Sequence, residues 1–192
     1  MLIREQSGEN GNEKFGSCEM IVGHGDIASV LPKRKNRLFF ASGVSNSRET
    51  RESEYAREKK LLLKQNRKSH LVYFSTLAVL YGDNRYVQHK REMEELIKQE
   101  FPRYTIMRLG NITWGTNPHT IINFLRAQLK KGKTIKIQDT YRYIIDKDEF
   151  LYWIGVIPDW NCEMNVPGRR MKVSEIVDEF CLIGIKTDAG KK

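Results

Sequence analysis

The feature that most constrains the fold is a regular alternation of short apolar segments and longer charged ones. Apolar segments of strand length, such as "RLFFASG" (37–43) and "SHLVYFSTLAVLYG" (69–82), are each followed by a charged stretch with helical periodicity. Strands that alternate with helices in this way form a mainly parallel sheet with helices on both faces. The predicted fold class is therefore α/β.

Glycine, proline and capping residues set the expected boundaries of these elements. The helix that runs to Glu100 begins after Asp83 or Asn84, either of which can cap it, and Gly132 closes the next helix. Strands are expected at 17–25, 37–43, 104–115, 133–139 and 140–146, and a further strand with its exit loop is expected at 69–82. Helices are expected at 26–31, 47–68, 84–100, 118–132, 147–157 and 172–184.

The length of 192 residues suits one domain with a substantial core. That domain is expected at 18–185, with a smaller lobe mainly over 133–180. Residues 1–17 are polar and glycine-rich without an apolar core, so we interpret them as a flexible leader rather than a signal peptide. Residues 186–192 are expected to be a disordered tail. No apolar run reaches the roughly 20 residues that span a bilayer, so no membrane association is predicted.

The cysteines and histidines predict neither a disulfide framework nor a metal site. Cys18, Cys162 and Cys181 are odd in number, widely spaced and without a CxxC pattern. The four histidines form no HxxxH or HExxH motif. Reduced thiols in a cytoplasmic location are therefore the default expectation.

The net charge of +9 requires a hypothesis about partners. Such a charge is typical of a nucleic-acid surface or of a pocket for phosphate-bearing ligands. The basic residues are spread along the chain, and no RNP-type aromatic motif or zinc finger accompanies them. A generally basic, solvated surface is therefore favoured over nucleic-acid binding.

Tyrosine and lysine stand four residues apart at three places: Tyr55–Lys59, Tyr86–Lys90 and Tyr143–Lys147. On a helix this spacing puts both side chains on one face, where a lysine can prepare a tyrosine for proton transfer. Tyr143–Lys147 lies in a predicted strand, where the two residues would be roughly 13 Å apart. Tyr55–Lys59 has charged neighbours and is interpreted as a solvated, self-paired helix surface.

The pair Tyr86–Lys90 opens a helix directly after a predicted strand. Together with Met93 and Ile97 it follows an i, i+4, i+7, i+11 stripe, so it is expected to face the sheet. This position is near the carboxyl edge of the sheet, where open α/β folds bind ligands. The alternative is a half-buried tyrosine beside a lysine that reaches solvent, and the spacing alone favours that alternative.

Several segments, in sequence order, resemble those of the extended short-chain dehydrogenase/reductases, the NAD-dependent epimerase/dehydratase group that acts largely on nucleotide sugars. These segments are "MIVGHGDIAS", "LFFASGVSNS", "YFSTLAVLYG", "YVQHK", "MRLGNITWG", "YRYIIDKDEF" and "MNVPGRRMKVSEIVDEF". The resemblance covers residues 20 to about 180. It implies a Rossmann-like, mainly parallel sheet and a small C-terminal substrate lobe, mainly 133–180.

The resemblance also implies a role for each matching residue. Tyr86 would be the general acid/base, and Lys90 would lower its pKa and bind the nicotinamide ribose. Thr76 would orient the substrate oxygen. Asn111 would lie near the substrate, and the Arg142 guanidinium would bind a nucleotide phosphate.

A nicotinamide cofactor, NAD or NADP, is implied by the same comparison. The turn at 23–28 matches GxGxxA, whose glycines let a pyrophosphate approach the start of a helix. The cofactor-binding residues would be Gly23, His24, Gly25, Asp26, Ile27, Ala41, Ser42, Gly43, Leu109 and Gly110. Family resemblance further implies a homodimer in which the helices at 47–68 and 84–100 pack as a four-helix bundle.

The sequence departs from the family pattern at three places. Only residues 32–37 separate Leu31 from Leu38. The family normally has two further strands and helices there, and the acidic residue that holds the adenosine ribose is absent from this sequence. Asp26 stands where an apolar residue is usual, and it would either cap the helix or repel phosphate. The family's catalytic hydroxyl falls on Leu77, one residue after Thr76.

These observations predict an NAD(P)-dependent epimerase, dehydratase or reductase that acts on a nucleotide sugar or a related carbohydrate. The alternative is a catalytically degenerate protein that keeps the fold and serves in binding or regulation. The departures from the family pattern support that alternative, whereas the glycine turn and the Tyr86–Lys90 pair favour an enzyme.

Overall fold

The computed structural model describes residues 21–182 with the exception of 35, 135, 136 and 138. The predicted leader, the predicted tail and Cys18 lie outside the described residues. The strand expected at 133–139 lies partly outside them, and its described residues form no strand.

The centre of the molecule is a five-stranded sheet in which every neighbouring pair is parallel. Its order is β1 (Ile21–Val22), β2 (Arg37–Phe40), β3 (His70–Thr76), β4 (Tyr104–Leu109) and β7 (Cys162–Val166). Because the strands are parallel, their carboxyl ends meet at one edge of the sheet. The predicted α/β class is thus confirmed.

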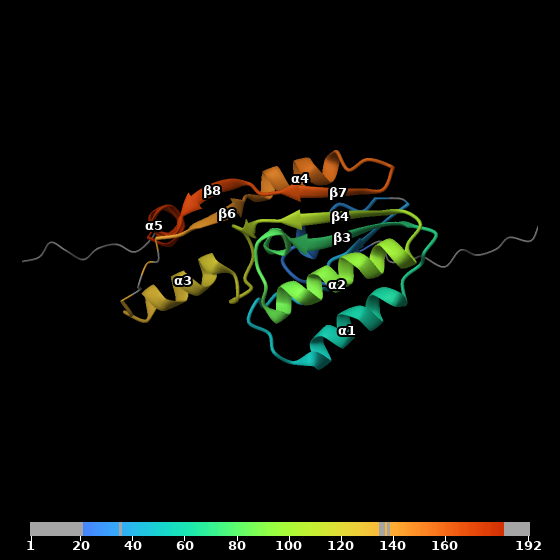
Figure 1. Cartoon of the computed structure of the whole chain (residues 1–192). Coiled ribbons are helices and arrows are strands. Elements are labelled where there is room, and N and C mark those ends of the chain that lie inside the picture. Colours follow the sequence, from blue (N-terminus) through green and yellow to red (C-terminus); the bar gives the residue numbers. More distant parts are fainter. Residues whose placement is uncertain (1–20, 35, 135–136, 138, 183–192) are drawn as a thin grey trace, which may run out of the picture.

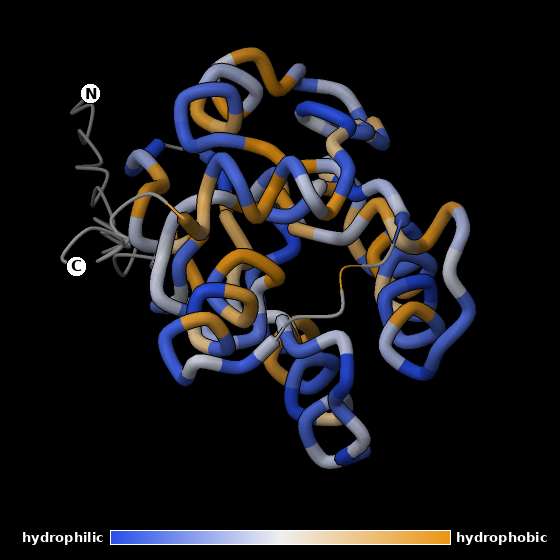
Figure 2. Tube along the Cα trace, turned by 90° about the vertical axis from the view of Figure 1, so that its left-hand side faces the viewer, coloured by the Kyte–Doolittle hydropathy of each residue, from blue (hydrophilic) through white to orange (hydrophobic). Residues whose placement is uncertain are grey.

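Helices cover both faces of this sheet (Figure 1). The helices α1 (Glu52–Leu63) and α2 (Arg85–Glu100) lie on one face, and α4 (Lys147–Gly155) lies on the other. Alternate strand residues point to opposite faces. Phe40 packs with the residues of α1 and α2, whereas Phe39 packs with those of α4. In Figure 2 the surrounding helices mix hydrophilic and hydrophobic residues, as expected of elements with one buried face.

A smaller lobe adjoins the carboxyl edge of the central sheet (Figure 1). Its three-stranded sheet has the order β5 (Asn111–Ile112), β6 (Tyr141–Ile145) and β8 (Arg169–Lys172), with β8 antiparallel to β6. It packs with α3 (Ile121–Lys130), α5 (Val173–Ile176) and the π-helical turn η3 (Val177–Cys181). A small lobe is therefore present, but β5 and α3 precede the expected range of 133–180, and α4 and β7 within that range belong to the central unit. The strand β8 and the central strand β7 were missed by the sequence analysis.

Several predicted boundaries are corrected by the structure. The helix expected at 47–68 covers only 52–63. In the segment 69–82, expected to hold a strand and its exit loop, the strand ends at Thr76 and the 3-10 turn η2 (Leu77–Leu80) follows. Asn84 rather than Asp83 caps α2, because its side-chain oxygen accepts from the Val87 N–H at 2.9 Å.

The prediction that Tyr143 and Lys147 share a strand is wrong. The strand β6 ends at Ile145, and Lys147 is the first residue of α4. The physical reason is the cap between them: the Asp146 carboxylate accepts from the Glu149 N–H at 2.8 Å and so starts a helix. Among the described residues, no helix has the length and apolar character needed to cross a membrane.

Candidate functional site

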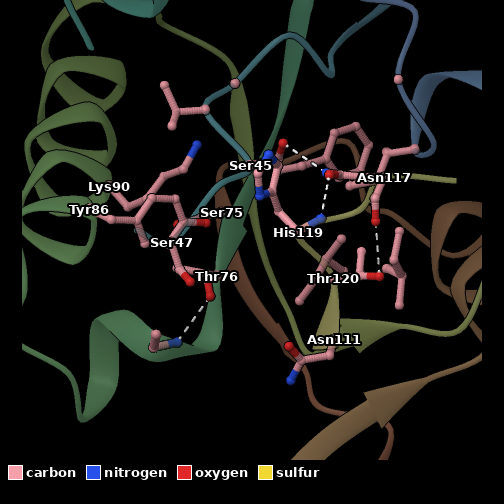
Figure 3. A pocket seen from close by; sticks show the side chains of 18 of the residues that line it. Ser45, Ser47, Ser75, Thr76, Tyr86, Lys90, Asn111, Asn117, His119 and Thr120 are labelled. Carbon is pink, nitrogen blue, oxygen red and sulfur yellow. Dashed lines mark hydrogen bonds between the residues drawn. The ribbon is translucent and has the colours of Figure 1, made fainter. Parts of the chain in front are cut away.

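The carboxyl ends of β1 to β4 open into a cavity of about 800 Å³. The predicted site residues that line it are His24, Gly25, Asp26, Ile27, Ala41, Gly43, Thr76, Tyr86, Lys90, Leu109, Gly110, Asn111 and Arg142. Gly23 and Ser42 are not in the lining. Figure 3 shows Thr76, Tyr86 and Lys90 on one side of the cavity, opposite Asn117 and His119. The fold therefore gathers residues that are widely separated in sequence.

The glycine turn after β1 contains one glycine that the backbone requires and one that it does not. Gly23 has a φ of +123°, and a Cβ there would lie 2.4 Å from the Ala41 carbonyl oxygen. This close contact lets β1 run beside β2. Gly25 lines the cavity, and a Cβ there would have no atom within 4 Å. Only Gly25 thus leaves open space on the cavity side.

The carboxylate of Asp26 holds the loop that follows β5. Its Oδ1 accepts from the Thr116 N–H and its Oδ2 from the Asn117 N–H, both at 3.0 Å. Gly115, with φ of +91°, has no room for a side chain because Asp26 lies against it. The Asp26 side chain therefore does not cap the turn that follows it. It places a negative charge in the cavity wall, at a position where the family usually has an apolar residue.

The residues at the ends of β2, β3 and β4 fit the nicotinamide half of a dinucleotide cofactor better than the residues around the 3-10 turn η1 (Ala28–Val30) and β1 fit its adenosine half. The ends of β2, β3 and β4 and the open side of Gly25 provide a cradle of small residues. The helix expected at 26–31, however, is a single 3-10 turn, η1 (Ala28–Val30), because Pro32 follows it and Leu31 is already extended. Within the described part of the chain, no strand pairs with the outer edge of β1, where the adenosine half would need support.

Tyr86 and Lys90 both lie in the first turns of α2 and both line the cavity. The Lys90 Nζ is 5.8 Å from the centroid of the Tyr86 ring. Burial raises the pKa of Tyr86 well above its ordinary value, the negative charge of Glu58 raises it further, and a hydrogen bond with Thr76 acts in the opposite direction. Tyr86 is therefore a phenol at neutral pH.

A buried carboxylate that the sequence analysis missed lies beside this pair. Glu58 of α1 is fully buried, and its Oε1 accepts from Lys90 Nζ at 2.9 Å and from the Tyr73 hydroxyl at 2.7 Å. Its Oε2 accepts from the Val44 N–H at 2.7 Å and lies 3.0 Å from the His89 Nε2. Burial acts to raise the pKa of Glu58, but the Lys90 charge and these hydrogen bonds outweigh it and hold the pKa far below its usual range.

The interpretation of α1 as a solvated, self-paired surface is therefore wrong for one of its faces. Tyr55, Glu58 and Leu62 are buried and follow the i, i+3, i+7 spacing of a helix face. The Tyr55 hydroxyl donates to the Glu49 carbonyl oxygen at 2.7 Å. This spacing was the available signal, but the surrounding charges in the sequence obscured it.

Thr76, not Leu77, presents its side chain to the cavity. Thr76 is the last residue of β3 and lines the cavity, whereas Leu77 is buried and begins η2. The Thr76 Oγ1 accepts from the Ala78 N–H at 3.2 Å, so its hydroxyl hydrogen is still able to donate. The hydrogen bond from Thr76 that acts to lower the pKa of Tyr86 uses this hydroxyl, so at this register Thr76 is placed to donate to the Tyr86 oxygen or to a ligand in the cavity.

The far side of the cavity is polar. The Asn111 Nδ2 donates to the Tyr143 carbonyl oxygen at 3.0 Å, and the Arg142 Nη1 donates to the Tyr141 carbonyl oxygen at 2.9 Å. Ser45, Asn117, His119 and Thr120 also line it. Ser45 lies in the segment "LFFASGVSNS", and no motif in the sequence covers the other three. Among the described residues, no three His, Cys, Asp or Glu side chains group in a way that could hold a metal ion.

Neither a protein-family model nor a curated protein sequence matches this chain. Solved structures with a similar fold include the Bordetella bronchiseptica enzyme WbmG in complex with NAD and UDP, which is 19% identical with a TM-score of 0.57. The alignment covers 73% of this chain and 54% of WbmG.

Two further structures with similar folds are nucleotide-sugar epimerases. The UDP-N-acetylglucosamine 4-epimerase of Methanobrevibacter ruminantium is 15% identical with a TM-score of 0.54, and 73% of this chain covers 57% of it. The UDP-glucuronic acid 4-epimerase of Bacillus cereus is 16% identical with a TM-score of 0.54, and 71% of this chain covers 55% of it. This chain therefore shares the fold of these solved structures, and it spans little more than half the length of each.

Proposed function

We propose that the chain acts as an NAD(P)-dependent epimerase, dehydratase or reductase on a nucleotide sugar or a related carbohydrate. The observation that supports it most is the convergence of Thr76, Tyr86 and Lys90 on one cavity with the glycine turn. WbmG, which has a similar fold, was crystallised with NAD and UDP. NAD and NADP are both compatible with the proposal.

The residues of the chain would divide the chemistry as follows. A bound nicotinamide supplies or accepts a hydride, and the ends of β2 to β4 together with Gly25 would hold it. Tyr86 would hold the proton that is exchanged with a substrate oxygen, and the Thr76 hydroxyl would orient that oxygen. Lys90 would hold the ribose with the donor that its buried partners leave free.

The sugar and its nucleotide would lie toward the small lobe, which would serve as the substrate lobe. Arg142 would bind a phosphate through its guanidinium, and Asn111 would contact the sugar. A cavity of about 800 Å³ lies within the range of sites that enclose one small organic ligand. Closure around both a dinucleotide and a nucleotide sugar would require further protein surface.

A second candidate is a catalytically degenerate protein that binds a ligand without turning it over. It is favoured by the Asp26 carboxylate in the cavity wall and by the single 3-10 turn that replaces a helix after the glycines. Both features would weaken the binding of a pyrophosphate. The Asp26 carboxylate repels the negative phosphates, and a single 3-10 turn has only a small helix dipole to attract them.

Titration of the protein with NADH and NADPH, followed by cofactor fluorescence, tests the proposal. We expect saturable binding that Gly25→Asp abolishes and Tyr86→Phe retains. A Cβ at Gly25 would have no atom within 4 Å and Gly25 lines the cavity, so this variant should fold while it places a carboxylate there. Gly155→Asp is the matched control, because Gly155 also has no neighbour within 4 Å and does not line the cavity.

The outcomes separate the two candidates. Binding lost in Gly25→Asp and kept in Gly155→Asp would support a cofactor site at the glycine turn and justify a screen of nucleotide sugars for turnover. Absence of binding of either cofactor at millimolar concentration would contradict the enzyme proposal. A nucleotide sugar that still binds under those conditions would support the second candidate.

A further inference from the structure

The carboxylate of Glu58 has no part in the mechanism proposed above, yet it contacts the lysine of that mechanism directly. The Lys90 Nζ is buried and has two protein partners, Glu58 Oε1 at 2.9 Å and the Tyr73 oxygen at 3.0 Å. An ammonium group has three donors, so one remains for a ligand. We call Val44, Glu58, Tyr73, His89 and Lys90 the Glu58 network. No buried side-chain nitrogen or oxygen of the described residues lacks a hydrogen-bond partner.

The Glu58 network changes the electric field that Lys90 exerts on Tyr86. A lone lysine 5.8 Å from the tyrosine ring would favour the phenolate, since opposite charge at that range favours the ionised form. The carboxylate 2.9 Å from the same nitrogen cancels most of that field. Gly43 leaves no room for another partner on this side, because a Cβ there would lie 2.7 Å from Lys90 Nζ and 2.8 Å from Glu58 Oε1.

We propose that Glu58 is a positioning residue that neutralises Lys90, adds to burial in keeping Tyr86 as a phenol, and thereby sets the cavity to give a proton to a substrate oxygen rather than to remove one from a hydroxyl. The inference rests on the proposed function and specifies its direction. The substrate class would be a ligand with a carbonyl oxygen at the reacting carbon, such as a keto form of a nucleotide-linked sugar.

The proton transfer itself is simple to balance. The O–H bond of Tyr86 breaks, and its proton forms the O–H bond of the product on the former carbonyl oxygen. The hydride that reduces the carbonyl carbon is that of a reduced nicotinamide, as the proposed function requires. A water molecule then returns a proton to the Tyr86 phenolate, and the hydroxide that forms leaves to the solvent. While Glu58 is ionised, Lys90 does little to stabilise this phenolate.

Other titratable groups near Tyr86 do not supply the missing positive charge. The titratable groups around Tyr86 and the Glu58 network are Tyr55 and Glu58 from α1, Tyr73 from β3, and Arg85, His89 and Lys90 from α2. The Arg85 guanidinium is itself paired with Glu52. Across the cavity the lining contains His24, Asp26, His119 and Arg142. Consistent with this arrangement, the negative charge of Glu58 adds to burial in raising the pKa of Tyr86.

The test is NMR titration of the full chain with tyrosine labelled at Cζ, whose chemical shift reports ionisation and requires neither cofactor nor substrate. The signal of Tyr86 is assigned by its absence in Tyr86→Phe. We expect its midpoint in the wild type to lie above 10, and Glu58→Gln to lower that midpoint by at least about one pH unit. The double variant Glu58→Gln/Lys90→Met should restore a high midpoint.

The control is Glu54→Gln, the same substitution one turn earlier in α1, where Glu54 pairs with Arg57 at the surface. It should leave the midpoint of Tyr86 unchanged. An unchanged midpoint in folded Glu58→Gln would overturn the proposal. If Glu58→Gln does not fold, the wild-type midpoint decides: a value below 10 would mean that the Lys90 field reaches Tyr86 and would also overturn it. Failure of the proposed function would be recognised separately, because it would appear as an absence of cofactor binding and not as an unchanged titration midpoint.

Discussion

Single residues set the balance of charge around the cavity. Glu58 is ionised in the interior because four donors surround its carboxylate: an ammonium, a phenol, an imidazole and a backbone N–H. Lys90 in turn stays buried because Glu58 compensates its charge. Removal of one member of such a pair leaves an uncompensated buried charge, which is far more costly than the absence of both.

The ionisation of Glu58 predicts how stability changes with pH. Its pKa is lowered in the folded protein, so the unfolded chain binds its proton more readily and this carboxylate stabilises the fold above the unfolded value of 4.5. The contribution is lost as the pH falls from 4.5 toward the lowered pKa of the folded state. We expect Glu58→Gln to lower the free energy of unfolding by up to about 3–5 kcal/mol at pH 7.

Urea denaturation followed by circular dichroism between pH 3 and pH 7 measures this effect. The difference in unfolding free energy between wild type and Glu58→Gln should be constant above about pH 5 and should shrink below it. A difference that stays the same down to pH 3 would mean that Glu58 is not ionised in the folded protein.

Among the elements, α2 has the greatest influence on the site. It begins at Arg85, and its first two turns carry both Tyr86 and Lys90 into the cavity wall. Its buried residues Met93 and Ile97 continue the same stripe and pack against the sheet. The start of this helix therefore determines where the tyrosine lies, and the Asn84 cap determines the start.

Replacement of the cap tests this dependence. Asn84→Ala should lower the free energy of unfolding by about 1 kcal/mol, because the Val87 N–H loses its side-chain acceptor. Asp83→Ala is the matched control, since Asp83 makes only an exposed pair with Arg91 at 3.4 Å. It should change stability by less than about 0.5 kcal/mol. Thermal and urea unfolding measure the stability of both variants. Equal decreases in the free energy of unfolding for Asn84→Ala and Asp83→Ala would contradict the assignment of Asn84 as the cap.

At the scale of the whole molecule, the cavity exists because two sheets meet at Gly110, between β4 and β5. A Cβ at Gly110 would lie 2.4 Å from the Pro167 carbonyl oxygen and 2.9 Å from that of Tyr143. The backbone of the central sheet and that of the small lobe are therefore in direct contact. The homodimer remains a prediction; the outward residues of α1 include Glu52, Lys59 and Lys60, which are charged and exposed.

A side chain at this contact should separate the two sheets. Gly110→Ala is expected to lower the free energy of unfolding by about 1–3 kcal/mol, since the backbone must move to admit the methyl group. Gly155→Ala is the control. A Cβ at Gly155 would have no atom within 4 Å and the residue lies in α4, so the free energy of unfolding of this variant should stay the same or rise slightly. Chemical denaturation of the two variants measures these changes. If Gly110→Ala had the same free energy of unfolding as the wild type, the backbone contact at Gly110 would not limit stability.

Much of the fold could be predicted because its signals are local. The stretch that ends at Thr76 is a continuous buried run of strand length, and the stripe of α2 repeats with the period of a helix, so the α/β class and the order of most elements follow from the sequence. The strands β7 and β8 escaped prediction because "CEMNV" and "RRMK" are short and "RRMK" is mostly charged. They are strands because neighbouring strands supply their hydrogen-bond partners.

The sequence by itself determined that Tyr86 and Lys90 share a helix face after a strand, since four residues on a helix fix that geometry. Only the tertiary structure decided what state the pair is in. Glu58 reaches Lys90 from another helix, 32 residues away in the chain, and Asp26 reaches across to the loop after β5, 90 and 91 residues away. Charge at a buried site depends on which groups packing brings within a few ångströms, and no local pattern in the sequence records that proximity.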